Sequence, residues 1–253
     1  MKAGRARAAT LVLLCLSLVA CSSQQSRTPE DGPHTPAEIN AELGMRYMQQ
    51  GNLDVALKKL KRALEQDPDL AMAHHYMALL YERYDSTEEA ERHFRKALSI
   101  TPDDPSLKNN YGVFLCGQQR YQEAVDIFLA VAKSPYYSRP EEAYENAGLC
   151  ALRIPDTASA EAYLRLALKF DPLRPVSLFQ MARLSYEQGR YFPARGFLQR
   201  FERVSPHSAE SLLLAVKVEH ELENEQTVAN YMKMLQDSYP GSAELNEARK
   251  VIR

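Results

Sequence analysis

The side chains that could bind a metal ion include six histidines spread along this chain of 253 residues. A zinc site needs several ligands at a fixed spacing, such as H-E-x-x-H or cysteines paired with histidines. The histidines show no such spacing, and the adjacent His74 and His75 point to different sides of a helix. We therefore expect them to pack or to lie at the surface. The set is His34, His74, His75, His93, His207 and His220.

Paired carboxylates, which general acid–base catalysis uses, occur at Glu88–Glu89 and at Glu141–Glu142. Both pairs stand where a helix is expected to begin, and negative charge there stabilises the helix macrodipole. The sequence has no glycine-rich phosphate loop and no nucleophile elbow. It predicts a protein that is not an enzyme and that uses no metal and no other cofactor.

Cys21 has the clearest chemistry in the chain because of what precedes it. Residues 2–7 carry three basic side chains, and residues 8–20 form an apolar stretch shorter than the roughly 20 residues of a membrane-spanning helix. The end of this stretch, LVAC, resembles the lipobox of bacterial lipoproteins, in which the cysteine sulfur receives a diacylglycerol. The resemblance implies that residues 1–20 are a signal peptide and that Cys21 is lipidated. The alternative is an ordinary secretory signal with an incidental cysteine.

Ser22 bears on where an acylated Cys21 would reside. Enterobacterial lipoproteins that stay at the inner membrane typically have aspartate at this position, so serine implies sorting to the outer membrane. Two or more acyl chains anchor a protein stably, whereas one chain binds only reversibly. Residues 21–36 are rich in Pro, Ser, Thr and charge and lack periodicity, which predicts a flexible tether. We expect a body anchored by lipid to the outer membrane and facing the periplasm.

Two further cysteines, Cys116 and Cys150, remain once Cys15 leaves with the signal peptide. They could form a disulfide in an oxidising compartment, or act as two small buried apolar side chains. Both fall inside helical patterns and nothing local demands a covalent link. We therefore predict no bridge.

The charge of the mature chain argues against a nucleic-acid partner. Without residues 1–20, which hold three basic and no acidic side chains, 28 basic residues face 33 acidic ones, a net charge of −5. Such a surface has no general attraction for phosphate backbones or anionic lipid headgroups. We expect neither a nucleic acid nor a small-molecule substrate as a partner.

A period of 34 residues organises the rest of the chain. One column is almost entirely alanine: Ala56, Ala90, Ala124, Ala160, Ala194 and Val228. Twelve residues earlier stand mostly small residues: Gly44, Ala78, Gly112, Gly148, Ala182 and Val216. Twelve residues later stand mostly prolines: Pro68, Pro102, Tyr136, Pro172, Pro206 and Pro240. Small residues let two helices cross closely, and proline ends a helix because it lacks an N–H donor.

This period and these residues resemble the tetratricopeptide repeat, a helix–turn–helix unit that stacks into a right-handed superhelix. The resemblance implies an all-α solenoid at residues 37–242 and a cap helix at 243–253. The six expected repeats are 37–70, 71–104, 105–138, 141–174, 175–208 and 209–242.

Local signals mark the expected turns between helices. Gly51 and Gly189 are expected to separate the two helices of their repeats. Ser86–Glu89 matches a capping box that opens a second helix. The one spacing of 36 residues places a two-residue insertion near Ser138–Pro140.

In tetratricopeptide repeats the first helix of each unit lines the concave surface at its second, fifth, ninth and twelfth positions. In the first four repeats these positions offer an apolar stripe with adaptable methionines, which suits an amphipathic helix or an apolar strand of a partner. The alternative is that packing between neighbouring repeats fills part of the stripe. The candidate groove residues are Met45, Met48, Leu79, Val113, Leu149, Leu152 and Phe179.

The chain also resembles the PilF/PilW family of type IV pilus biogenesis lipoproteins. The segments that carry this resemblance are AELGMRYMQQGNLDVALKKLKRALEQDP (41–68), LKNNYGVFLCGQQRYQEA (107–124), RYFPARGFLQRF (190–201), SAESLLLAVKVEHELEN (208–224) and YPGSAE (239–244). The resemblance implies a pilotin, an outer-membrane lipoprotein that binds the pilus secretin and promotes its multimerisation or localisation. Its partners would be the secretin and, through the acyl chains on Cys21, the outer membrane. The alternative is a periplasmic adaptor that scaffolds cell-wall hydrolases or proteases.

Overall fold

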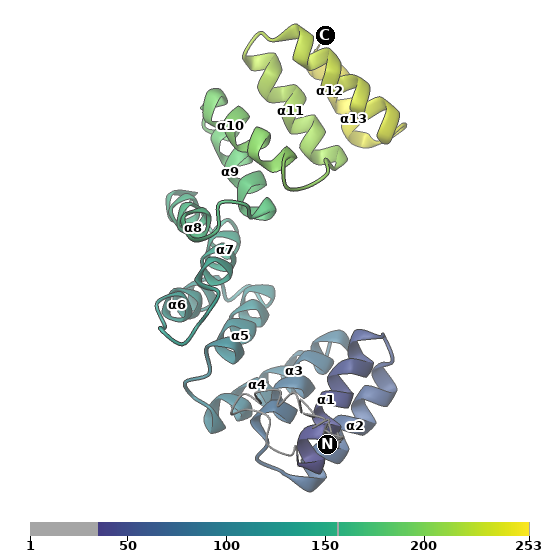
Figure 1. Ribbon diagram of the computed structural model, residues 1–253, viewed down its shortest axis with the longest axis vertical. Helices are drawn as coiled ribbons and strands as arrows, with labels where there is room; N and C mark the ends of the chain where they lie inside the picture. Colours follow the sequence, from purple (N-terminus) through teal and green to yellow (C-terminus); the bar gives the residue numbers. More distant parts are fainter. Residues whose placement is uncertain (1–34, 156, 253) are drawn as a thin grey trace, which may run out of the picture. The chain divides into compact units, whose positions relative to one another are not determined.

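The computed structural model describes residues 35–155 and 157–252, and within them it contains thirteen helices and no strand (Figure 1). The helices are α1 (Pro36–Gln49), α2 (Leu53–Gln66), α3 (Ala71–Arg83), α4 (Thr87–Ile100), α5 (Pro105–Gly117), α6 (Tyr121–Ala132), α7 (Pro140–Ala151), α8 (Thr157–Phe170), α9 (Pro175–Glu187), α10 (Tyr191–Glu202), α11 (Ala209–Glu221), α12 (Glu225–Ser238) and α13 (Ala243–Val251). The all-α expectation is confirmed. The signal peptide, Cys21 and the tether up to residue 34 lie outside the described residues.

Each range expected to hold a repeat contains one pair of helices, and α13 occupies the range of the cap. The two helices of a pair pack on each other, and the second also packs on the first helix of the next pair. The helices α1 and α7 begin one residue earlier than expected, at Pro36 and Pro140. Proline suits the first position of a helix, where its missing N–H would have no partner. No helix in the described part of the chain is long and apolar enough to span a membrane.

The columns of small residues mark the places where the paired helices cross. A Cβ atom on Gly44 would lie 2.5 Å from Leu60 Cγ, and one on Gly148 would lie 2.7 Å from Leu164 Cγ. The five alanines of the alanine column are fully buried in the core. The close-crossing explanation drawn from the period therefore holds in the structure.

The turn inside five of the six pairs needs one residue with positive φ. Gly51 and Gly189 supply it with φ of +78° and +70°, as expected for glycine. The equivalent positions in other repeats are held by Asp85, Gln119 and Glu223, whose φ values are 55°, 63° and 54°. The left-handed residue is thus a requirement of the turn, which the chain meets even where glycine is absent.

The expected capping box at Ser86 does not form, and this prediction was wrong. The Ser86 side chain makes no cap hydrogen bond to α4, and its Oγ instead donates to the carbonyl of Tyr84 at 3.5 Å. The backbone at Ser86, with ψ of 77°, is not extended. A complete capping box opens α11, where Ser208 has the extended ψ of 169° and exchanges hydrogen bonds with Ser211. Backbone direction, and not the sequence motif alone, decides which serine caps its helix.

The insertion lies in the loop between α6 and α7, residues 133–139, which is longer than the equivalent links elsewhere. Tyr137 anchors this loop, since its ring is only 6% exposed and joins the cluster that includes Val131, Ala143 and Tyr144. The two extra residues are therefore accommodated by a packed loop and leave the flanking helices intact.

Cys116 of α5 and Cys150 of α7 form a disulfide, so the prediction of no bridge was wrong. Their Cα atoms lie 5.9 Å apart, although the residues are 34 positions apart in sequence. Such a separation is normal for a disulfide. Each helical pattern viewed alone gave no reason for a bridge, because the stacking of neighbouring repeats brings the two sulfurs together.

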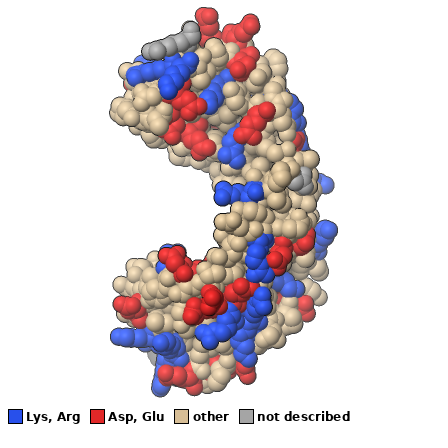
Figure 2. Space-filling view, turned by 180° about the vertical axis from the view of Figure 1, so that it is seen from behind, with Lys and Arg blue, Asp and Glu red and all other residues tan. Residues whose placement is uncertain are grey.

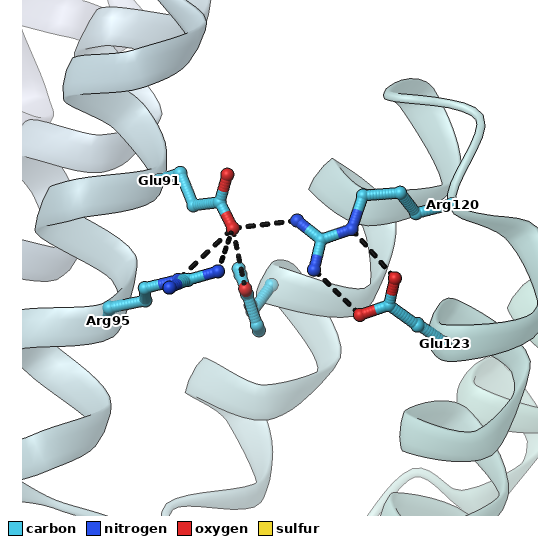
Figure 3. A network of polar contacts seen from close by, with 5 residues as sticks. Glu91, Arg95, Arg120 and Glu123 are labelled. Atoms are coloured by element: carbon cyan, nitrogen blue, oxygen red, sulfur yellow. Dashed lines mark hydrogen bonds and ion pairs between the residues drawn. The ribbon is translucent and has the colours of Figure 1, made fainter.

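A network of charged side chains joins the second and third repeats (Figure 3). Glu91 Oε1 of α4 accepts hydrogen bonds from Arg95 Nη2 at 2.7 Å, Arg120 Nη1 at 2.6 Å and the Tyr111 hydroxyl at 3.2 Å. Arg120 also pairs with Glu123 at 2.6 Å. One carboxylate thus links α4 to α5 and to the turn before α6.

The same charged arrangement recurs between the fourth and fifth repeats. Glu161 of α8 pairs with Arg165 at 2.7 Å and with Arg190 at 2.6 Å. A third inter-repeat carboxylate, Glu145 of α7, accepts from Ser177 N at 3.0 Å and Ser177 Oγ at 2.6 Å, and also pairs with Arg174. Because Ser177 is in the first turn of α9, Glu145 caps a helix of the following repeat.

Candidate partner-binding surface

Most of the ninth and twelfth positions of the first helices lie in three hollows, each between two consecutive repeats. We call them the repeat 1–2, repeat 3–4 and repeat 5–6 hollows. Their volumes are about 250 Å³, 390 Å³ and 350 Å³, respectively. The structure therefore divides the expected continuous stripe into separate binding-sized depressions.

The repeat 1–2 hollow is lined by side chains of α1 and α3. Met45 and Leu79 are partly buried, whereas Met48 is only 5% exposed and belongs mostly to the core. Glu82 lines the same hollow, and burial raises the pKa of its carboxyl to about 7, against the smaller lowering effect of Arg83. Three predicted residues, Met45, Met48 and Leu79, thus come together beside Glu82, which holds the twelfth position of the second repeat.

The repeat 3–4 hollow contains Val113, which is 48% exposed, and Leu149, which is partly buried. Both cysteines of the disulfide also line it, and so does Asn146. The covalent link therefore joins the two helices whose spacing sets the width of this hollow.

The repeat 5–6 hollow is aromatic and charged. Phe179 lines it together with Tyr186 and Arg183 of the same helix, and its ring packs against Phe201 with centroids 5.9 Å apart. Leu213 and Lys217 of α11 complete it. These two residues hold the fifth and ninth positions of the sixth repeat, so the positional rule used for the other repeats would have found them.

Leu152 lies in none of the three hollows. It is partly buried and packs against the core clusters that contain Leu115 and Leu164. The alternative reading of the stripe, in which neighbouring repeats fill it, applies to this residue and largely to Met48.

The five histidines within the described residues do not assemble into a metal site, and His34 lies outside those residues. His74 Nδ1 and His93 Nδ1 share a hydrogen bond of 2.9 Å, and His74 Nε2 donates to the Pro68 carbonyl at 3.0 Å. Burial, with the nearby His74 and Arg92, lowers the pKa of His93 to about 4. Among residues 35–155 and 157–252, no group of three His, Cys, Asp or Glu side chains could hold a metal ion.

Acidic and basic side chains alternate over the side of the repeat body that Figure 2 displays. Several charged side chains of the repeat body are paired within one helix, such as Arg95 with Glu91 and Arg165 with Glu161. The repeat 1–2 and repeat 3–4 hollows add apolar side chains to this mixed-charge surface, among them Met45, Leu79, Val113 and Leu149.

Comparison with known proteins agrees with this geometry. Models of the tetratricopeptide repeat match residues 44–84, 86–138, 115–175 and 176–208. The type IV pilus assembly protein PilF of Pseudomonas aeruginosa is 32% identical over 244 residues, which cover 95% of this chain and 97% of that protein. The chain belongs to the PilF family. It is a tetratricopeptide repeat protein of type IV pilus biogenesis.

Two solved structures of the PilF family have the same fold. A structure of P. aeruginosa PilF is 32% identical and has a TM-score of 0.78, covering 85% of this chain and 97% of that one. A crystal structure of PilW, described as a widely conserved type IV pilus biogenesis factor, is also 32% identical, with a TM-score of 0.76 and coverage of 85% and 98%. These matches confirm the resemblance drawn from the sequence and indicate protein partners for the repeats.

Proposed function

We propose that this protein is a pilotin, an outer-membrane lipoprotein that binds the pilus secretin and promotes its multimerisation or its localisation in the outer membrane. The observation that carries the proposal is the series of three hollows along a repeat body of the PilF family. Adaptable methionines, aliphatic side chains and aromatic rings in such hollows suit a helix or an extended segment of a partner protein.

The mechanism we propose is mechanical. Acyl chains on Cys21 would commit the chain to the outer membrane, since multiple acylation anchors stably. The hollows would hold secretin subunits at the same membrane, which raises their effective concentration. Ring closure is then favoured over aggregation without any chemical step in the repeat body.

The Cys116–Cys150 disulfide supports a periplasmic position for the repeats. Disulfides persist in oxidising compartments such as the bacterial periplasm and are rare in the cytosol. A periplasm-facing anchor at Cys21 places the repeats where a secretin subunit passes on its way to the outer membrane.

The experiment that tests this function measures detergent-resistant secretin multimer and its membrane location in cells. The strains carry the wild-type gene, a deletion, Cys21→Ser, and the control Cys15→Ser, which changes a cysteine inside the signal peptide. We expect the deletion to abolish the multimer, Cys21→Ser to leave secretin mislocalised or poorly assembled, and Cys15→Ser to behave as wild type. Unchanged secretin in the deletion would contradict the proposal, and co-isolation of a cell-wall hydrolase or protease would then favour the adaptor function.

A further inference from the structure

The repeat 1–2 hollow differs from the repeat 5–6 hollow in holding a partly buried acid that no ion pair engages, since Glu210, the acid of the repeat 5–6 hollow without an ion pair in the described structure, is exposed. In the repeat 5–6 hollow, Lys217 pairs with Glu247 at 2.5 Å and Arg183 lies 3.8 Å from Glu187. In the repeat 1–2 hollow, no hydrogen bond or ion pair within the described part of the chain engages the Glu82 carboxylate. This hollow therefore holds a partly buried acid that no ion pair engages, although Arg83 also lines the hollow.

The surroundings of Glu82 make that acid costly to leave unpaired. It is partly buried, and its neighbours in the hollow include the apolar side chains of Met45, Met48 and Leu79. Burying a carboxylate without a partner is unfavourable, and a cation within hydrogen-bond reach reverses the effect. Arg83, the next residue on α3, also lines the hollow and lowers the pKa of Glu82, but it forms no ion pair with Glu82 in the described structure.

The rest of the hollow fits the stem of a long basic side chain. Lysine and arginine place their methylene groups on apolar surface and their charge at a polar tip. The flexible thioether of Met45 can adapt to such a stem, and Leu79 adds apolar contact. An aliphatic wall with one acid is thus complementary to an apolar segment that carries one cation.

We propose that the repeat 1–2 hollow binds an apolar segment of the partner that carries one lysine or arginine, whose cation pairs with Glu82. The inference rests on the proposed function, because the partner it describes is the secretin. Glu82 selects the segment, and the apolar side chains hold it. The other two hollows contribute apolar contact without this charge selection.

The experiment measures the affinity of the purified full chain for short overlapping peptides that cover the secretin of the same organism. The variants are Glu82→Gln, Glu82→Lys and the control Glu65→Gln, which alters an exposed carboxylate of α2 that pairs with Arg62 and lines none of the three hollows. We expect Glu82→Gln to weaken the best peptide about tenfold and Glu82→Lys to weaken it further, because a desolvated charge then loses its partner. The control should bind within about twofold of the wild type, as expected for an exposed pair.

The decisive test exchanges the charges between the peptide and the protein. Changing the basic residue of that peptide to glutamate should weaken its binding to the wild type and restore binding to Glu82→Lys. Equal binding to the wild type and to Glu82→Gln would overturn the inference, and so would a best peptide without a basic residue. Self-association of the chain that Glu82→Lys removes would assign the hollow to a second copy and would also overturn it.

A designed pair of probes separates this inference from the proposed function. The first is a short amphipathic helical peptide with one central lysine, and the second has norleucine in that place. Tighter binding of the lysine peptide, dependent on Glu82, supports the inference even if no secretin peptide binds and the pilotin function fails. Equal binding of both probes overturns the inference even if the secretin binds elsewhere on the chain.

Discussion

Cys116 at the end of α5 and Cys150 near the end of α7 are joined by a disulfide that links the third repeat to the fourth. The two residues are 34 positions apart, so the bond closes a loop about one repeat long. Because each repeat of a solenoid contacts only its neighbours, this bond strengthens one of the five junctions between repeats directly.

Removing the disulfide should destabilise the repeat body. For a loop of this length we expect Cys116→Ser with Cys150→Ser to lower the free energy of unfolding by about 4 kcal/mol. Chemical denaturation of both proteins, with and without a reductant, measures the difference. The reductant should lower the free energy of unfolding of the wild type and leave that of the double variant unchanged. An unchanged wild type would contradict the prediction.

The glycines at which paired helices cross, such as Gly44 and Gly148, should not tolerate a side chain. A Cβ atom at Gly148 would meet Leu164 Cγ at 2.7 Å, so Gly148→Ala should cost about 1–3 kcal/mol of stability through overpacking. Gly196→Ala is the matched control, since Gly196 is inside α10 and a Cβ there meets nothing within 4 Å. The control should gain about 0.5–1 kcal/mol, because alanine has the higher helix propensity. Thermal unfolding compares the two, and similar shifts for both would refute the role of close crossing.

The inter-repeat ion pairs should matter more than those on a single exposed helix surface. Glu161 contacts both Arg165 and Arg190 and is only 16% exposed, so Glu161→Gln should lower stability by about 1–2 kcal/mol. The pair Arg62–Glu65 is exposed at both ends, so Glu65→Gln should change stability by less than about 0.5 kcal/mol. Denaturation at low and high salt provides the measurement. Equal losses of stability in both variants would show that the ion pairs between repeats contribute no more than exposed pairs do.

Acid should weaken the second repeat through the buried histidine pair. Burial, with His74 and Arg92 nearby, holds the pKa of His93 at about 4, below the ordinary value near 6.5, so the fold favours its neutral form. The contribution of neutral His93 to the free energy of unfolding is complete above about pH 6.5, and it is lost as the pH falls towards 4. Glu89 opposes this shift, and the Tyr81 ring stacks on His93 with centroids 5.5 Å apart.

Unfolding measured between pH 4 and pH 7 tests the histidine prediction. His93→Gln should flatten the loss of stability towards acid, whereas His220→Gln, at an exposed position, should retain the slope of the wild type. A slope that survives His93→Gln would show that other groups carry the acid sensitivity.

A charge introduced into the repeat 3–4 hollow should weaken partner binding without unfolding the protein. Val113 is 48% exposed there, so Val113→Glu should leave thermal stability within a few degrees and reduce the recovery of secretin in co-isolation several-fold. Val55→Glu is the control, because Val55 is 37% exposed on α2 and lines none of the hollows. Equal recovery with both variants would place the binding surface elsewhere on the repeats.

Much of the fold could be predicted from the sequence because the relevant constraints are local and repeat. Close crossing demands a small residue, as at Gly44 and Gly148, and helix ends tolerate proline, as at Pro68 and Pro172. Each requirement recurs with every unit, so a single chain displays it several times. The one insertion, near residue 138, was visible for the same reason.

The tertiary structure decided what depends on contacts between repeats. The disulfide, the capping of α9 by Glu145, and the unpaired Glu82 each depend on which side chains neighbouring helices bring together. Groups about 30 residues apart meet in these cases, and no local pattern specifies their distance. The sequence by itself determined a stack of tetratricopeptide repeats, because backbone geometry imposes the same residue types on every unit. Only the stack itself determined where its surface is hollow and where a charge lacks a partner, because those features arise from packing.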